Sequence, residues 1–367
     1  LSDGDTLLID GYEGIAIINP SETTLFRYGK VNLRRKRIKD LLDDEGSLPS
    51  VTEDGEKVTF FANADTAEEI SKARDHGCEG IGLFRSESIF LRKNEIPSEN
   101  DQYEEYREAV VAANSLPVTI RTLDLGGDKI LDSIGREKEE NPFMGFRAIR
   151  YCLRNPDVFL DQLRAILRAS AHGTVKIMFP MVSGIGELVR AKEFLSTAKR
   201  QLREMDVPFD EDIQVGCMIE TPSAVVISDM LASEVDFFSV GTNDLVQYLL
   251  AVDRINNEIA YLYEPHHPAV IRSLAHVFEV AKDKNVEVSV CGEIAGDPHF
   301  LPLLLALGVR CLSTVSPMIP ELKFFARRFS MADAGGLWEG IEQMKRSSEI
   351  NQSLKNFYDE RVSELIT

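Results

Sequence analysis

The sequence lacks the features of a membrane or secreted protein. Its apolar runs all fall short of the roughly 18 residues that a membrane helix requires, and its first residues, Leu1-Ser2-Asp3-Gly4-Asp5, do not form a signal peptide. The five cysteines are scattered and show no CxxC spacing, which indicates a reducing compartment and neither a disulfide framework nor a zinc site. These absences predict a cytoplasmic protein that does not contact a membrane.

Basic residues are also scarce relative to acidic ones. Lysine and arginine number 41 in 367 residues against 60 aspartates and glutamates, so the formal net charge is −19. Because phosphate backbones are bound by a basic stripe, and no sustained stripe is present, a nucleic-acid partner is not expected. A local arginine cluster can still make a pocket for a small anion, whatever the total charge.

The N-terminal part reads as a remnant followed by a linker. The sequence has no initiator methionine and begins with two β-rich runs, Thr6–Ile9 and Gly14–Asn19, separated by a turn at Asp10-Gly11. Two strands are too few for a domain, so residues 1–29 are expected to be the end of a domain that begins outside this sequence. Residues 30–49 predict a charged linker helix with one apolar stripe, rather than a phosphate-binding segment.

From residue 50 to residue 367, short β-branched runs alternate with segments of helical period. The expected strands are Val58–Ala62, Gly80–Phe84, Val118–Leu123, Val175–Phe179, Gln214–Ile219, Asp236–Val240, Glu287–Val290 and Cys311–Val315. Eight such repeats favour an α/β fold in which parallel strands close into a (β/α)8 TIM barrel. A doubly wound open sheet is the alternative. In a barrel, the functional residues are expected at the C-terminal ends of the strands.

Arginines and carboxylates stand at these strand ends. Arg85 and Arg121 stand at the C-terminal ends of the second and third strands, and Arg147 and Arg254 lie in inserts after the third and sixth. Guanidinium groups suit phosphate and carboxylate oxygens, so four of them at one mouth would bind a small anion, although a single arginine is more often a surface ion pair.

Glu220 and Asp244 are candidate ligands for Mg²⁺ or Mn²⁺, because hard cations prefer oxygen donors. Each carboxylate could instead cap the helix that follows it, although Thr221 is a better cap than Glu220. Cys291 ends an apolar run and is either a buried structural cysteine or a thiol that acts as acid or nucleophile at the mouth. His266-His267 is interpreted as loop structure rather than a metal pair.

Eight consecutive motifs carry a resemblance to a known family. In chain order they read GLFRSE, RTLDLGGDK, NPFMGFRAIR, IMFPMV, MIETPSA, DFFSVGTNDLVQY, AVDR and CGEIAGDP. They resemble the C-terminal half of Enzyme I, the phosphoenolpyruvate-protein phosphotransferase family of the bacterial sugar phosphotransferase system. The resemblance covers roughly Val58 to Ser316. It implies a TIM barrel that binds phosphoenolpyruvate (PEP) and Mg²⁺ and releases pyruvate.

The resemblance implies a role for each strand-end candidate. The residues it assigns to PEP are Arg85, Arg121, Arg147, Asn243, Asp244 and Arg254. It makes Glu220 and Asp244 the Mg²⁺ ligands, and it makes Cys291 the acid that protonates the enolate carbon of pyruvate. Such chemistry needs charge to be neutralised on the transferring phosphoryl group, which arginines and Mg²⁺ supply.

The resemblance also implies partners. In the family, the phosphoryl acceptor is a histidine in a Gly-rich stretch of a separate N-terminal domain, and no such stretch occurs in these residues. A neighbouring helical domain docks the carrier protein HPr, so HPr is an expected partner through the region that precedes this sequence. The family dimerises through its C-terminal half, and a homodimer is therefore expected.

Other functions remain open at this stage. The chain could be the barrel of a pyruvate phosphate dikinase or PEP synthase, or a module that senses PEP without turnover. The residues do not distinguish a sugar-transport enzyme from a nitrogen-regulatory one. The segment CLSTVSPMIPELK departs from the family, which has an acidic, phenylalanine-bearing turn before Ser-Met-Ser at this position.

Overall fold

The computed structural model describes residues 5–10, 15–21, 24–25, 28, 42, 47–93, 96–125 and 141–366. The chain divides into two compact units, Leu1–Glu45 and Gly46–Thr367. In the first unit, β1 (Leu7–Asp10) pairs antiparallel with β2 (Ile15–Ile18), as in the expected hairpin. The turn at Gly11 and most of the predicted linker helix lie outside the described residues. The division into 1–29, 30–49 and 50–367 therefore stays a prediction.

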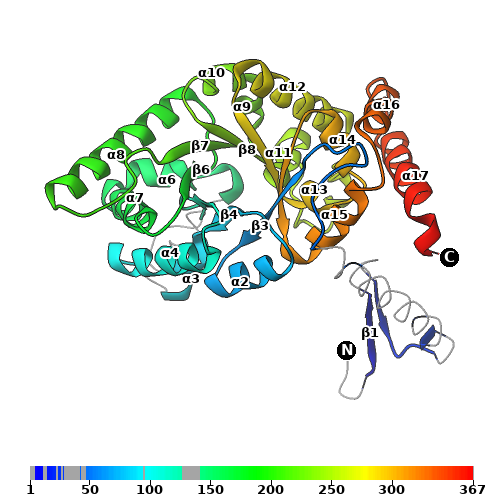
Figure 1. The fold of residues 1–367 in the computed structure, drawn as a ribbon, viewed down its shortest axis with the longest axis horizontal. Coiled ribbons are helices and arrows are strands. Elements are labelled where there is room, and N and C mark those ends of the chain that lie inside the picture. Colours follow the sequence, from blue (N-terminus) through cyan, green and yellow to red (C-terminus); the bar gives the residue numbers. More distant parts are fainter. Residues whose placement is uncertain are drawn as a thin grey trace. The chain divides into compact units, whose positions relative to one another are not determined.

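The second unit contains a closed barrel of eight parallel strands (Figure 1). Each strand pairs with the next in the sequence, and the last closes the barrel by pairing with both its predecessor and the first strand. The predicted TIM-barrel fold is confirmed, and the open doubly wound sheet is excluded. The strands are β3 (Thr59–Ala64), β4 (Ile81–Arg85), β5 (Val118–Arg121), β6 (Val175–Phe179), β7 (Gln214–Ile219), β8 (Phe237–Gly241), β9 (Glu287–Cys291) and β10 (Cys311–Val315).

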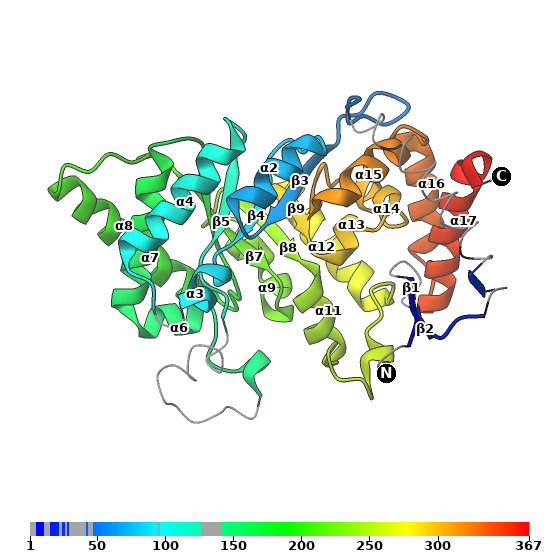
Figure 2. The ribbon, with the colours of Figure 1, turned by 90° about the horizontal axis from the view of Figure 1, so that it is seen from below.

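Helices form a ring outside the strands (Figures 1 and 2). The predicted period of one of them is confirmed, because Leu188, Ala191, Leu195, Ala198 and Leu202 form the buried face of α8 (Ile185–Glu204). The other α-helices that the structure describes in the barrel unit are α2 (Ala67–Asp75), α3 (Glu87–Lys93), α4 (Glu99–Ala113), α6 (Ile149–Arg154), α7 (Pro156–Ser170), α9 (Pro222–Val226), α10 (Ser228–Leu231), α11 (Thr242–Leu250), α12 (Pro268–Lys284), α13 (Glu293–Gly296), α14 (Leu301–Ala306), α15 (Ile319–Ala326), α16 (Met331–Ile341) and α17 (Ser347–Ile366). Short 3₁₀ turns occur at Pro142–Met144, Ala260–Leu262 and Ser316–Met318.

The interior of the barrel is closed by an apolar cluster to which five strands contribute. Its members are the buried side chains of Leu83, Met178, Met218, Phe237 and Cys291. Three of these, Leu83, Met218 and Cys291, also line the cavity at the mouth of the barrel. The cluster therefore forms an apolar floor beneath the polar groups at the strand ends.

One strand ends earlier than predicted. The apolar run Val118–Leu123 predicts a strand that reaches Leu123, whereas β5 ends at Arg121. Beyond Arg121, the Thr122 amide still donates to the Met178 carbonyl at 3.0 Å, but the Leu123 amide donates to the Gln162 side chain at 2.9 Å. A side chain thus replaces the neighbouring strand as hydrogen-bond partner, and the chain turns away toward Asp124.

At one side of the barrel unit, the C-terminal helix α16 lies beside α14, and α17 lies beside α16 (Figures 1 and 2). The α16 helix begins with a capping box, in which Ser330 and Asp333 exchange hydrogen bonds. Phe325 and Phe329 pack against Phe357 of α17 and fix this helix to the barrel unit. Among the described helices, none combines the length and the apolar character that crossing a bilayer requires.

Candidate functional site

A cavity of about 680 Å³ opens at the C-terminal ends of the strands. All eight residues that the sequence singled out lie in its wall, although they come from five strand ends and from two inserts. They are Arg85, Arg121, Arg147, Glu220, Asn243, Asp244, Arg254 and Cys291. The barrel therefore brings together residues that are separated by up to 206 positions in the sequence, from Arg85 to Cys291. Their chemical roles are a separate question.

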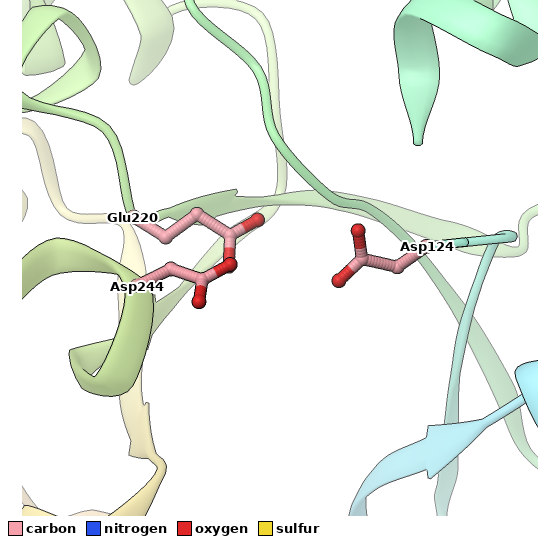
Figure 3. A group of neighbouring side chains, drawn as sticks. All are labelled: Asp124, Glu220 and Asp244. Atoms are coloured by element: carbon pink, nitrogen blue, oxygen red, sulfur yellow. The ribbon is translucent and has the colours of Figure 1, made fainter. Parts of the chain in front are cut away.

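Three carboxylates meet inside this cavity (Figure 3). Glu220 follows β7, Asp244 lies in the first turn of α11, and Asp124 reaches toward both from the loop after β5. Their ligand oxygens all lie within 4.8 Å of one another, which is close enough to hold one metal ion. Three carboxylate oxygens suit a hard divalent cation. The site can therefore bind a metal.

The Glu220 side chain is held rigidly. It is 2% exposed, and its Oε1 accepts a hydrogen bond from the Met181 amide at 2.5 Å. Met181 has a φ of +55°, an uncommon backbone conformation for a residue other than glycine. Burial, together with the nearby Asp124 and Asp244 carboxylates, raises the pKa of Glu220 to about 8. The nearby arginine therefore does not fully offset the repulsion among the Glu220, Asp124 and Asp244 carboxylates.

Two arginines lie deep in the cavity and share one carboxylate. Arg121 Nη1 donates to Asp124 Oδ2 at 2.7 Å, and Arg147 Nη2 donates to Asp124 Oδ1 at 2.8 Å. Arg147 Nη2 also lies 3.3 Å from Asp244 Oδ2, and these arginine side chains are only 12% and 10% exposed. Their Nε atoms are buried and have no hydrogen-bond partner in the described part of the chain. Unpaired buried donors are costly, so an anion that accepts from them would be favoured.

The other two arginines lie at the rim. Arg85 Nε contacts Asp65 Oδ1 at 2.7 Å, and Arg254 Nη1 contacts Glu293 Oε1 at 3.4 Å. Their side chains are 41% and 37% exposed, which leaves both guanidinium groups free to reorient. The site therefore combines two fixed guanidinium groups at its base with two adaptable ones at its entrance.

Asn243 is oriented by the turn that follows β9. Its Oδ1 accepts from the Glu293 amide at 2.9 Å, and its carbonyl accepts from the Tyr263 hydroxyl at 3.3 Å. Gly292 allows this close approach: its φ is +104°, and an added Cβ would lie 2.5 Å from Thr242 Oγ1 and 2.8 Å from Asn243 Oδ1. A larger residue at position 292 would displace the Asn243 amide group.

The Cys291 thiol is buried at the cavity floor. Its Sγ accepts from the Ser239 hydroxyl at 3.3 Å and lies 3.6 Å from the Val240 carbonyl, to which it can donate. Burial raises the pKa of the thiol to about 11, although the Ser239 hydrogen bond opposes this shift. The thiol is therefore protonated at neutral pH, which suits a proton donor better than a nucleophile.

The remaining predictions for single residues have clear outcomes. All five cysteines are free and buried, and the four that lie outside the cavity are Cys78, Cys152, Cys217 and Cys311. Thr221, not Glu220, caps α9 by accepting from the Ala224 amide at 3.2 Å. His267 caps α12, and His266 stacks on Phe300, so this pair belongs to the loop as predicted.

Three polar residues in or beside the cavity are not predicted by the sequence. Asp124 lies three residues past Arg121, and the sequence indicates no partner for it. Glu87 binds Arg121, and Tyr248 accepts from Arg147 at 3.4 Å while its own hydroxyl donates to the Phe143 carbonyl at 2.5 Å. Both lie in helices, where a carboxylate or a tyrosine gives no local signal of such a contact.

Comparisons with known proteins show the family of this chain. A family model described as "PEP-utilising enzyme, PEP-binding domain" matches residues 39–331. Proteins named phosphoenolpyruvate-protein phosphotransferase are 40% identical in Geobacillus stearothermophilus, 38% in Bacillus subtilis and 40% in Haemophilus influenzae, over 98%, 98% and 97% of this chain. A solved citrate lyase from Burkholderia xenovorans has a TM-score of 0.40 at 14% identity, over 77% of this chain and 90% of that one. The chain spans 62–63% of the length of the three phosphotransferases.

Proposed function

The chain belongs to the PEP-utilising enzymes and contains the PEP-binding domain of that family, and on this premise we propose that it is the catalytic barrel of a phosphoenolpyruvate-protein phosphotransferase. The observation that carries the proposal is the meeting of four guanidinium groups, three carboxylates and one protonated thiol in a single cavity. The names of the relatives favour this activity over a dikinase, a synthase or a sensing module.

The arginines would bind the two anionic groups of PEP. Arg121 and Arg147 carry buried Nε donors that have no partner among the described residues, and they lie where charge is shielded from water. Arg85 and Arg254, at the rim, would close on the substrate from the entrance, and the Asn243 amide would add a neutral hydrogen bond. Charge-assisted hydrogen bonds of this kind stabilise the charge that develops on a transferring phosphoryl group.

The carboxylates fit a magnesium ion. Glu220 and Asp244 would be its ligands, and Asp124 lies close enough to contribute a third oxygen. The raised pKa of Glu220 supports this fit, because a divalent cation would neutralise the negative charge that the protein leaves uncompensated. When bound, Mg²⁺ would polarise the phosphoryl and enolate oxygens of PEP.

Cys291 would supply the proton that completes the reaction. When the P–O bond of PEP breaks, the phosphoryl group passes to an acceptor histidine and the enolate of pyruvate remains. The thiol would then give its proton to the methylene carbon of the enolate, which forms the C–H bond of pyruvate and leaves a thiolate to be reprotonated by solvent. The pKa of about 11 keeps the thiol protonated until that step.

The family resemblance supports a proposal about partners beyond this chain. We propose that the acceptor is a histidine in an N-terminal domain, that the phosphoryl group passes from there to HPr, and that two barrels associate as a homodimer. The whole phosphotransfer reaction would need that domain. The barrel by itself would bind PEP and protonate or deprotonate pyruvate at carbon.

Calorimetry tests this proposal directly. PEP titrated into the chain is expected to bind more tightly when Mg²⁺ is present, and Arg121→Ala is expected to abolish this Mg²⁺-dependent binding. Arg164→Ala is the matched control, because this guanidinium is 15% exposed and pairs with Glu99 away from the cavity. Deuterium exchange into pyruvate is expected for the wild type and not for Cys291→Ser. Mg²⁺-independent binding, or binding unaffected by Arg121→Ala, would refute the proposal.

A further inference from the structure

Glu87 lies just outside the cavity and holds one of its arginines. It is the first residue of α3, its side chain is 13% exposed, and it is not among the residues that line the cavity. Its Oε1 accepts from Arg121 Nη2 at 2.9 Å and from the Asp124 amide at 3.0 Å. One carboxylate oxygen thus fixes both the side chain at the start of the Arg121–Asp124 segment and the backbone at its end.

The middle of this segment is fixed by a buried glutamine. Gln162 is 1% exposed, and its Oε1 accepts from the Leu123 amide at 2.9 Å. Its Nε2 donates to Ser86 Oγ at 3.2 Å and to the Tyr106 hydroxyl at 3.0 Å, so the glutamine cannot rotate without breaking these contacts. The segment is therefore held from behind at successive amides, and Glu87 provides the contact that reaches a guanidinium group.

Glu87 and Asp124 hold Arg121 in different ways. Asp124 lines the cavity and also binds Arg147, so a bound anion competes with it for the arginine donors. Glu87 lies behind Arg121, where a ligand in the cavity does not replace it. Its bond to Nη2 can persist while Nη1 and Nε, the other donors of the same planar group, donate to a ligand.

We propose that Glu87 is a positioning residue, which orients the Arg121 guanidinium so that its Nη1 and Nε face the cavity. This inference rests on the proposed function, since it assumes that Arg121 binds PEP. The carboxylate acts through hydrogen-bond geometry, because Oε1 must accept from two donors at once. A neutral group of the same shape can therefore take its place.

Two substitutions separate geometry from charge. Glu87→Gln retains an oxygen that can accept from both donors, so PEP is expected to bind with a Kd within about threefold of wild type. Glu87→Ala removes both hydrogen bonds, and the Kd is expected to rise at least about tenfold. If Glu87→Ala fails to fold, Glu87→Asp replaces it, because the shorter side chain cannot reach both donors. If Glu87→Gln raises the Kd for PEP as much as Glu87→Ala, or as much as Glu87→Asp where that variant replaces it, the inference is overturned.

A double-mutant cycle tests whether Glu87 acts through Arg121. In an Arg121→Lys background there is no planar guanidinium group to orient. Glu87→Ala is therefore expected to change the Kd for PEP by less than about threefold in that background. A purely structural role would give the same tenfold loss in both backgrounds. Glu99→Ala is the matched control, because Glu99 binds Arg164 and Arg168 outside the cavity, and it is expected to leave the Kd unchanged. A wild type that binds no PEP would instead refute the proposed function.

Discussion

A single methyl group at position 241 is expected to displace the central carboxylate of the proposed metal site. Gly241 ends β8 with a φ of −82°, so alanine adds no left-handed strain there. Its Cβ would lie 2.7 Å from Glu220 Oε2 and 2.9 Å from Met218 Sδ. The carboxylate must therefore move by roughly 0.7 Å to reach an ordinary contact of 3.4 Å. Glu220 has little freedom to do so, because it is buried and its other oxygen is held by Met181.

The expected loss of cation affinity follows from how little the metal–ligand distances of a working site can vary. Ligand distances vary by only about 0.2 Å in a working site, which is well below this displacement. Changes to groups that orient a metal ligand typically lower affinity by about 10- to 100-fold, or about 1.4–2.7 kcal/mol. Gly241→Ala is expected to weaken cation binding by that amount and also to lower stability by about 1–3 kcal/mol through overpacking.

The assay is a Mn²⁺ titration followed by electron paramagnetic resonance, with Mg²⁺ competition, on protein whose fold is checked by circular dichroism. Gly216→Ala is the control, because its Cβ would lie 2.4 Å from the Phe237 ring and would overpack the barrel without touching Glu220. It is expected to lose stability and to keep the cation affinity of wild type. A folded Gly241→Ala protein that binds the cation within twofold of wild type would refute this reasoning about Glu220.

Three further predictions concern charge in the cavity. Because Glu220 has a folded-state pKa of about 8, above its ordinary value of 4.5, its contribution to stability is present below pH 4.5 and is lost as pH rises through 8. Thermal unfolding of the cation-free chain should therefore show stability that falls as pH rises from 4.5 to 8. Mg²⁺ should raise the stability more at pH 8 than at pH 6, and an equal increase at the two pH values would contradict this prediction. Arg147→Lys is expected to raise the Kd for PEP at least about tenfold in calorimetry, because an ammonium group has one nitrogen, whereas this guanidinium contacts Asp124 and Asp244 through Nη2 and also presents Nη1 and Nε as donors. PEP and Mg²⁺ are expected to strengthen each other's binding by about 1–3 kcal/mol in a thermodynamic cycle, and strictly additive binding would argue against a shared site.

The fold could be predicted because its signals are local and repeated. The strands are short, mostly apolar runs of four to six residues, and α8 shows its buried stripe directly in the spacing of Leu188, Ala191 and Leu195. Strand limits were less certain, because they depend on the partner that takes each amide. The end of β5 is decided by Gln162, which lies 39 residues beyond Leu123.

The cavity could be predicted in part for a related reason. A residue directly after a parallel strand must lie at the mouth of a barrel, so Arg85, Glu220 and Cys291 could be placed from position alone. Asp124 and Glu87 could not be assigned a role in this way, because their importance comes from partners on other elements. The GGDK part of the RTLDLGGDK motif lies outside the described residues, and its place in the site stays a prediction.

The internal ion pairs explain why the two proposed ligands should bind together. Without ligands, Asp124 joins Arg121 and Arg147, and Arg147 also faces Asp244, so the cavity neutralises part of its own charge. A cation that draws the carboxylates toward itself weakens these pairs and frees the guanidinium donors for an anion. An anion that engages the guanidinium groups frees the carboxylates in the same way. Each ligand therefore removes a competitor of the other, and the coupling arises from Asp124, the residue that binds to both arginines and lies among the metal-binding carboxylates.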